Sequence, residues 1–64
     1  MSLPRVGDIW RFVCATGTRH YLVTGEPKYF INNIYAVPSV LLEDGKQVNM
    51  RFSIQEAISW TKVA

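Results

Sequence analysis

The segment VLLEDGKQVNM, residues 40–50, constrains the fold more than any other part of this chain. The Asp-Gly pair at its centre suits a tight turn, because glycine adopts positive φ without steric cost and aspartate tolerates it. After the turn, Val48, Met50 and Phe52 alternate with polar residues, the period of a strand with one face in a core and one in water. The segment therefore predicts a β-hairpin whose turn is scaffold. The face left for recognition or for a subunit interface is Gln47, Asn49 and Arg51.

Two further strands are predicted before this hairpin, and the first arm of the hairpin is predicted to begin well upstream of Val40. Residues 7–13 (GDIWRFV) and 19–24 (RHYLVT) are rich in β-branched and aromatic residues and are separated by turn residues. The segment from Phe30 to Leu42 predicts a strand with a break or bulge at Pro38, because proline has no N–H to donate to a sheet. An alternative is a turn at Asn32-Asn33, which would give two shorter strands.

The C-terminal part of the chain changes period. Ser53 and Glu56 have the spacing of a capping box, in which each side chain bonds the backbone at the other end of the first helical turn. This predicts one short helix at about residues 54–59, and the segment WTKV predicts a short last strand. The prediction is an all-β fold of five short strands, with the helix before the last of them.

The length of 64 residues predicts a single domain, residues 1–64, with a small core. The only cysteine, Cys14, cannot form a disulfide within the chain, whereas small secreted domains usually depend on several. The sequence also has no apolar run of the length of a signal peptide or a membrane span. We therefore expect a soluble protein of the cytoplasm with no membrane partner.

The order of these elements, together with the opening segment VGDIWR, resembles the Src homology 3-like (Tudor-like) small β-barrel. The chain also resembles short phage and prophage proteins that begin with V-G-D-hydrophobic-W/Y-R, contain an L-x-D-G-K hairpin and end in a short helix plus strand. This resemblance implies a five-stranded Src homology 3-like barrel and a place in the host cytoplasm. It also implies a role as a modulator or inhibitor of host machinery.

The residues give no pattern of an enzyme, a metal site or a cofactor site. One histidine and one cysteine cannot supply the four ligands of a structural zinc site. Cys14 and His20 lie on either side of a predicted turn, but no third group is present to orient a base. The glycines stand singly, so no phosphate-binding loop is formed. We predict no catalytic residue, no metal and no cofactor.

Aromatic and basic residues are the most informative remaining feature. The chain has two Trp, three Tyr and three Phe, more than so small a barrel can bury, so we expect some of them to be exposed. We expect one of Trp10 and Phe12 to point outward, and Tyr29 and Phe30 to point to opposite faces. Exposed Trp, Tyr and Arg dominate binding hot spots. The predicted partner-binding residues are Trp10, Arg11, Arg19, His20, Tyr21, Tyr29 and Phe30.

These observations support three hypotheses. The first is a non-enzymatic binding module that occludes a host protein or regulatory complex. The second is a protein that binds single-stranded DNA or RNA through the same residues plus Arg51 and Lys62, by base stacking and phosphate contacts. The third is a homo-oligomer that binds a small ligand or nucleotide between its subunits. The modest net charge of +2 favours the first over the second.

Overall fold

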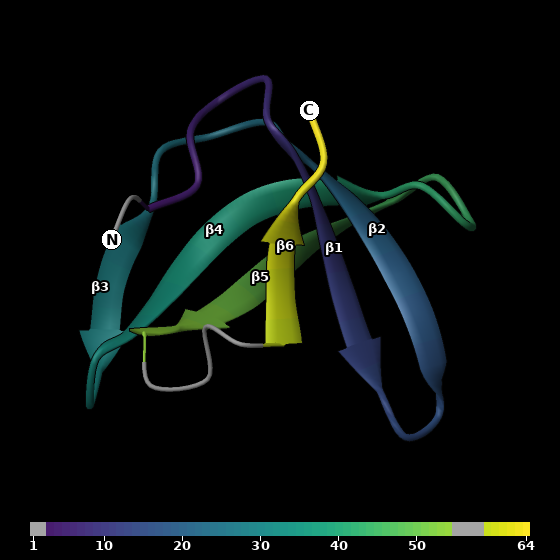
Figure 1. The fold of residues 1–64 in the computed structure, drawn as a ribbon. Helices are drawn as coiled ribbons and strands as arrows, with labels where there is room; N and C mark the ends of the chain where they lie inside the picture. The colour runs from purple at the N-terminus through teal and green to yellow at the C-terminus, as the bar shows by residue number, and fades with distance from the viewer. Residues whose placement is uncertain (1–2, 55–58) are drawn as a thin grey trace.

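A computed structural model describes residues 3–54 and 59–64, which form six β-strands and no α-helix. The strands are β1 (Ile9–Cys14), β2 (Gly17–Val23), β3 (Lys28–Ile31), β4 (Ile34–Leu41), β5 (Lys46–Ser53) and β6 (Trp60–Lys62). All belong to one antiparallel sheet that curls into an open half-barrel (Figure 1). The predicted all-β class is confirmed, and the curled sheet is compatible with a small β-barrel.

Strand β4 holds this sheet together because it pairs along both edges. One edge pairs with β5 over the whole length of both strands. The other edge is shared, since residues 34–36 pair with β3 and residues 39–41 pair with β2. Beyond β2 come β1 and then β6. The order around the half-barrel is β5, β4, β2, β1, β6, with β3 beside the first half of β4.

The turn between β3 and β4 accounts for the difference between five predicted strands and six observed ones. Asn32 and Asn33 have φ of 52° and 62°, the left-handed pair of a tight hairpin turn. Asparagine adopts this conformation more readily than most residues because its short polar side chain can hydrogen-bond locally. The prediction of one long strand from Phe30 was wrong, and the alternative turn at Asn32-Asn33 is confirmed.

The predicted break at Pro38 was also wrong, since β4 runs through this residue and keeps its register opposite Asn49. The carbonyl oxygen of Pro38 accepts hydrogen bonds from the N–H groups of Thr24 (2.9 Å) and Gly25 (3.2 Å), which follow β2. The nitrogen and the carbonyl of one strand residue point to the same edge. The missing N–H of Pro38 therefore faces the gap between β3 and β2, and β5 loses no hydrogen bond.

The core lies on the inner face of the half-barrel. It consists of Trp10, Val23, Val37, Met50, Phe52 and Trp60, with Leu3, Phe12, Tyr21 and Tyr35 packed against it. Met50 and Phe52 are buried and Val48 is half-buried, as their alternation in the sequence predicted. The expectation that either Trp10 or Phe12 points outward was wrong, because residues two apart in a strand share a face.

The predicted helix at about residues 54–59 is not confirmed. Residues 55–58, including Glu56 of the predicted capping box, lie outside the described residues. The described chain resumes at Ser59, directly before β6.

Substitution of Asn33 tests the turn between β3 and β4. We expect Asn33→Ala to lower the free energy of unfolding by about 1 kcal/mol, because alanine adopts the left-handed conformation at a steric cost. We expect Asn33→Gly to be at least as stable as the wild type, because glycine has no such cost. Urea unfolding curves measure both, and equal stability of the two variants would contradict the assigned turn.

Substitution of Gly25 tests the crossing of the chain over Pro38. A Cβ atom at position 25 would lie 2.9 Å from both Cβ and Cγ of Pro38, closer than packed carbon atoms come. We expect Gly25→Ala to destabilise the fold by about 1–3 kcal/mol, the usual cost of overpacking. The neighbouring exposed residue supplies the control, since Thr24→Ala should change the stability by less than about 0.5 kcal/mol. Unchanged stability of Gly25→Ala would disprove the close approach.

Candidate functional site

The sheet does not close on itself within the described residues, and this leaves an open seam between β5 and β6. Among the described strands, β5 pairs only with β4, and β6 pairs only with β1. Side chains link the two ends of the sheet, because the rings of Phe52 and Trp60 lie 5.7 Å apart between centroids. The seam is therefore spanned by aromatic packing at this point and not by backbone pairing.

A hollow of about 400 Å³ lies on the inner face beside this seam, and we call it the seam pocket. Its residues come from both sides of the opening and from the strands between them. The lining residues are Phe12, Arg19, Tyr21, Leu41, Val48, Asn49, Met50, Arg51 and Trp60. The volume lies within the range of small-ligand pockets, and it suits one or two protein side chains.

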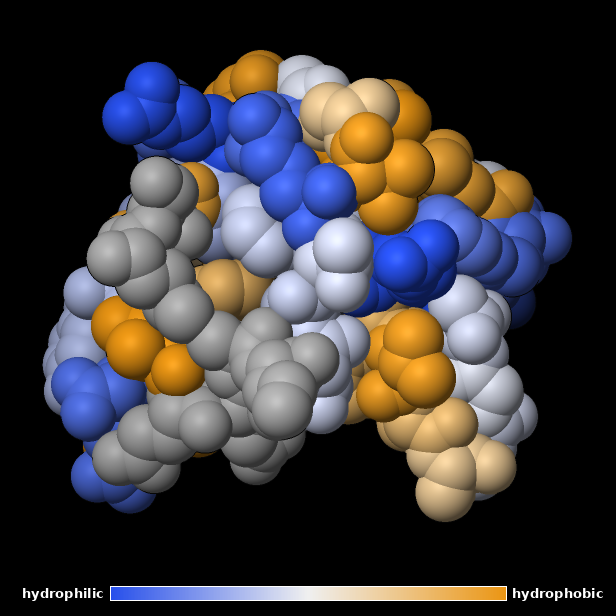
Figure 2. Space-filling model, in the orientation of Figure 1, coloured by the Kyte–Doolittle hydropathy of each residue, from blue (hydrophilic) through white to orange (hydrophobic). Residues whose placement is uncertain are grey.

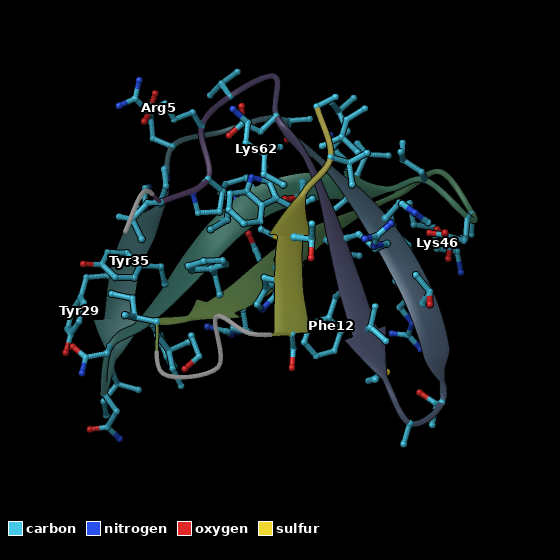
Figure 3. All side chains as sticks on the ribbon, in the orientation of Figure 1. Arg5, Phe12, Tyr29, Tyr35, Lys46 and Lys62 are labelled. Carbon is cyan, nitrogen blue, oxygen red and sulfur yellow. The ribbon has the colours of Figure 1, made fainter. Side chains whose placement is uncertain are left out.

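Three aromatic rings form one wall of the seam pocket. Trp60 is central, with its ring centroid 4.6 Å from that of Phe12 and 5.4 Å from that of Tyr21. In Figure 3, the Phe12 side chain lies between β1 and β6. Trp60 itself is only 8% exposed, whereas Phe12 and Tyr21 are half-buried. The aromatic surface of this wall therefore comes mainly from Phe12 and Tyr21, and the buried Trp60 packs against both rings and holds them in place.

Arg19 supplies positive charge at this aromatic wall. It is exposed, and it lies opposite Phe12 in the β1–β2 pairing, which places both side chains on the inner face. None of the lining residues is acidic. Arg19 consequently has no carboxylate partner among the lining residues that the structure describes.

Arg51 also borders the seam pocket, but its charge is directed elsewhere. Its guanidinium carbon lies 4.3 Å from the centroid of the Phe30 ring on β3. Arg51 is opposite Ala36, and Ala36 is opposite Lys28, so this contact crosses the outer face of the sheet. The guanidinium of Arg51 belongs to an outer cluster with Phe30 and Lys28.

The structure places the predicted contact residue Trp10 in the core, where it is 8% exposed. Its indole N–H donates a hydrogen bond to Oδ2 of Asp8 (3.3 Å). The same oxygen accepts from the backbone N–H of Arg5 (3.0 Å), and this bond is the main reason that the pKa of Asp8 is lowered. Lys62 Nζ lies 3.8 Å from the other carboxylate oxygen. Trp10 thus packs the interior and leaves little surface for a partner.

Two other predicted contact residues, Arg11 and His20, lie opposite each other on the outer face of β1 and β2. His20 Nδ1 is 2.7 Å from Oε2 of Glu43, and the backbone N–H of His20 donates to Oε1 of Glu43 (2.9 Å). These hydrogen bonds lower the pKa of Glu43, chiefly the one to the imidazole. This pair ties β2 to the turn after β4.

The remaining predicted contact residues, Tyr29 and Phe30, lie on β3 and are 62% and 57% exposed. Tyr29 packs edge-on against Tyr35, with 5.5 Å between ring centroids, at the β3 end of the sheet and far from Phe12 (Figure 3). The expectation of exposed aromatic residues is confirmed here. The structure brings only Arg19 and Tyr21 of the seven predicted residues into the seam pocket, where Asn49 and Arg51 of the predicted β5 face join them.

Phe12 and Trp60 line the seam pocket but are not among the predicted site residues. The strand period places Phe12 on the same face as Trp10. It does not show that the inner face of β1 comes next to an open seam. That position depends on the pairing of β1 with β6, which are distant in the sequence.

A row of apolar residues crosses the outer face but lacks the chemistry of the seam pocket. The backbone N–H of Val63 donates a hydrogen bond to the carbonyl oxygen of Ile9. In the next strands of the sheet, Ile9 lies opposite Leu22, and Leu22 lies opposite Val40. Hydrophobic residues also gather at the upper right of the view in Figure 2. The row contains no aromatic or charged side chain, and it therefore has no group to orient a partner.

A second hollow and the thiol of Cys14 also lack the groups of a functional site. A hollow of about 330 Å³ is lined by Thr24, Pro38, Ser39, Gln47, Val48 and Asn49, none of them charged or aromatic. Cys14 has its Sγ 3.1 Å from the hydroxyl of Thr16, and this hydrogen bond is the main cause of its lowered pKa. Cys14 is opposite Gly17, and His20 lies on the other face of β2, so the two do not form a nucleophile–base pair.

The described residues contain no group of three or more His, Cys, Asp or Glu side chains that could hold a metal ion. Within the same residues, no helix is long and apolar enough to cross a membrane. No protein-family model, curated protein or solved structure matches this chain. The candidate site consequently stands on its own geometry.

The pair His20–Glu43 predicts a pH dependence of stability. The pKa of Glu43 is lowered from 4.5 in the folded state, so its charge stabilises the fold above that pH and this contribution is lost as the pH falls through the folded pKa. We expect the melting temperature of Glu43→Gln to lie below that of the wild type at about pH 6, with the gap closing by about pH 2.

The control is Glu26→Gln, because Glu26 is exposed and makes no ion pair with another described residue. Its melting temperature should follow the wild type across this pH range. A gap for Glu43→Gln that stays constant at every pH would show that the charge of Glu43 contributes nothing.

Proposed function

We propose that this protein is a non-enzymatic binding module that holds a segment of another protein in the seam pocket. The observation that carries this proposal is the combination of three packed aromatic rings and Arg19 in a hollow whose described lining residues include no acidic side chain. Aromatic surface beside an arginine is the composition of binding hot spots in protein interfaces.

The chemistry of the wall indicates what the partner presents. An apolar or aromatic side chain would pack against Phe12, Tyr21 and Trp60, where aromatic pairs gain energy beyond their buried area. A carboxylate next to that side chain would bond the guanidinium of Arg19, a charge-assisted contact. The expected partner segment therefore combines an apolar anchor with an aspartate or glutamate.

The biological part of the proposal comes from the sequence resemblance. We propose a Src homology 3-like module of phage type that acts in the host cytoplasm and inhibits or modulates a host protein by occupying its surface. The curled all-β sheet is compatible with such a barrel. No bond is made or broken in this mechanism, and no metal or cofactor is needed.

A pair of arginine variants tests the proposed site. Peptides that bind the wild-type protein are first selected from a random displayed library. We expect Arg19→Ala to weaken binding of the selected peptides about tenfold or more, a loss of about 1.4 kcal/mol. The matched control is Arg11→Ala, because Arg11 lies on the neighbouring strand but on the outer face. Isothermal titration calorimetry measures both.

Equal losses for the two arginine variants would place the contact outside the seam pocket. Failure of any peptide to bind would contradict the proposed function itself. Amide chemical shifts provide a second readout, because bound peptide should shift the signals of Phe12, Tyr21 and Trp60.

A second candidate function, binding of single-stranded nucleic acid, is favoured by the outer cluster. Phe30 is 57% exposed and lies against Arg51, beside Lys28 on the same face. Base stacking on an exposed ring together with cations on phosphates is how many such proteins bind.

Binding to a fluorescent oligothymidylate tests this candidate. If the outer cluster binds nucleic acid, the affinity should fall steeply as salt is raised, and Phe30→Ala should weaken it about fivefold or more, because stacking contributes about 1–3 kcal/mol per base. Arg19→Ala serves as the comparison on the inner face. Absence of binding at low salt would exclude this function.

A further inference from the structure

We propose that the partner segment binds as an additional β-strand on the open edge of β5, beside the seam pocket. This inference rests on the proposed function and specifies how the partner is recognised. Part of the recognition would come from the backbone of the partner, and part from side chains that enter the seam pocket. Strand addition of this kind is an established mode of peptide recognition.

The position of Pro38 shows which backbone groups of β5 face the seam. The carbonyl of Pro38 points to the β2 side, so Pro38 and Asn49 form a pair without hydrogen bonds between them. Asn49 therefore directs its own N–H and C=O away from β4. Because the pattern alternates, Gln47 and Arg51 do the same, and the backbone groups of Val48 and Met50 pair with β4.

These outward groups have no backbone partner among the described residues. β5 has eight residues, and its pairing with β4 runs from Lys46 to Ser53 without a register shift. By contrast, the pairing of β3 is irregular between Tyr29 and Ile31, and β6 has three residues. Natural proteins usually shorten, bend or block an edge strand. β5 thus presents the longest regular edge in the described part of the sheet.

The open edge and the seam pocket coincide. The part of β5 that lines the pocket, residues 48–51, includes Asn49 and Arg51 of the open edge. A strand added there would point every second side chain toward the inner face, where the aromatic wall and Arg19 lie. A partner segment of about five residues would cover Gln47 to Arg51, at about 3.4 Å per residue.

Charge identifies the occupant as an acidic extended segment of another protein. Arg19 has no carboxylate among the lining residues, so an aspartate or glutamate on the added strand would complement it. A second copy of this chain could pair its own β5 with the same edge. That copy would bring a second pocket wall whose described residues include no acidic side chain, so these residues would supply no carboxylate to either Arg19.

Amide hydrogen exchange tests the pairing directly. We expect a selected acidic peptide to slow exchange of the Gln47, Asn49 and Arg51 amides about tenfold or more at saturation, because these N–H groups become hydrogen-bonded. The Val48 and Met50 amides are the internal control, since they already pair with β4. Slowing of all five amides alike, or of none of them, would contradict strand addition.

Changes to single backbone groups provide a second, independent measurement. Asn49→Pro removes the outward N–H and leaves the pairing with β4, as Pro38 does on the opposite strand. We expect this variant to bind the peptide about tenfold more weakly than Asn49→Ala, which loses only the side chain. Should Asn49→Pro fail to fold, N-methylation of alternate peptide residues in the wild-type complex gives the same information. N-methylation of the peptide residues whose N–H groups face β5 should weaken binding, and N-methylation of the residues between them should not.

The outcomes separate the two proposals. Peptide binding that depends on Arg19 but is insensitive to N-methylation, without slowed exchange of the β5 edge amides, would overturn strand addition and leave the seam pocket as the site. Absence of any Arg19-dependent binding would overturn the proposed function. Sedimentation that shows a dimer, with the same edge amides protected in the absence of peptide, would identify a second copy as the occupant and overturn the inference.

Discussion

The packing of Trp60 is the interaction on which the rest of the structure depends. β6 pairs with β1 through only three residue pairs, so hydrogen bonds alone hold it weakly. The indole ring lies against Phe12 and Tyr21 on one side of the opening and against Phe52 on the other. The ring therefore links β6 to β5, the strand at the opposite end of the curled sheet, without closing the sheet by backbone hydrogen bonds. The same ring completes the core and forms the wall of the seam pocket.

A second constraint comes from the shared edge of β4. Two strands must meet along one edge without competing for its hydrogen bonds, and Pro38 stands where they meet. A residue with an N–H at this point would direct a donor into a gap. Proline has none to satisfy, and its ring packs close to Gly25, where the chain leaves β2. The break expected from proline in a strand is absent because Pro38 lies where the neighbour of β4 changes from β3 to β2, so no hydrogen bond is lost there.

Much of the local structure followed from the sequence, whereas the site did not. Asp44 and Gly45 marked one hairpin, and the alternation around Met50 assigned the faces of β5 correctly. The prediction of a break at Pro38 was wrong because the effect of a proline depends on which edge of the strand its nitrogen faces. That edge is decided by the pairing of β4 with β2, β3 and β5, which the local sequence does not show. The position of Trp10 in the core could not be predicted for a related reason. Residue type indicates that an aromatic ring suits binding, but only the curl of the sheet decides whether the ring lies in the core or at an opening.

The weak backbone attachment of β6 has a consequence for folding. The hairpins β1–β2, β3–β4 and β4–β5 join neighbouring segments, and such local contacts form early because little chain entropy is lost. Docking of β6 on β1 joins the two ends of the described chain and requires the largest loop to close. The wall around Trp60 would then be completed in the last step of folding. A chain that has formed its hairpins but not docked β6 would keep most of its sheet and still lack a binding pocket.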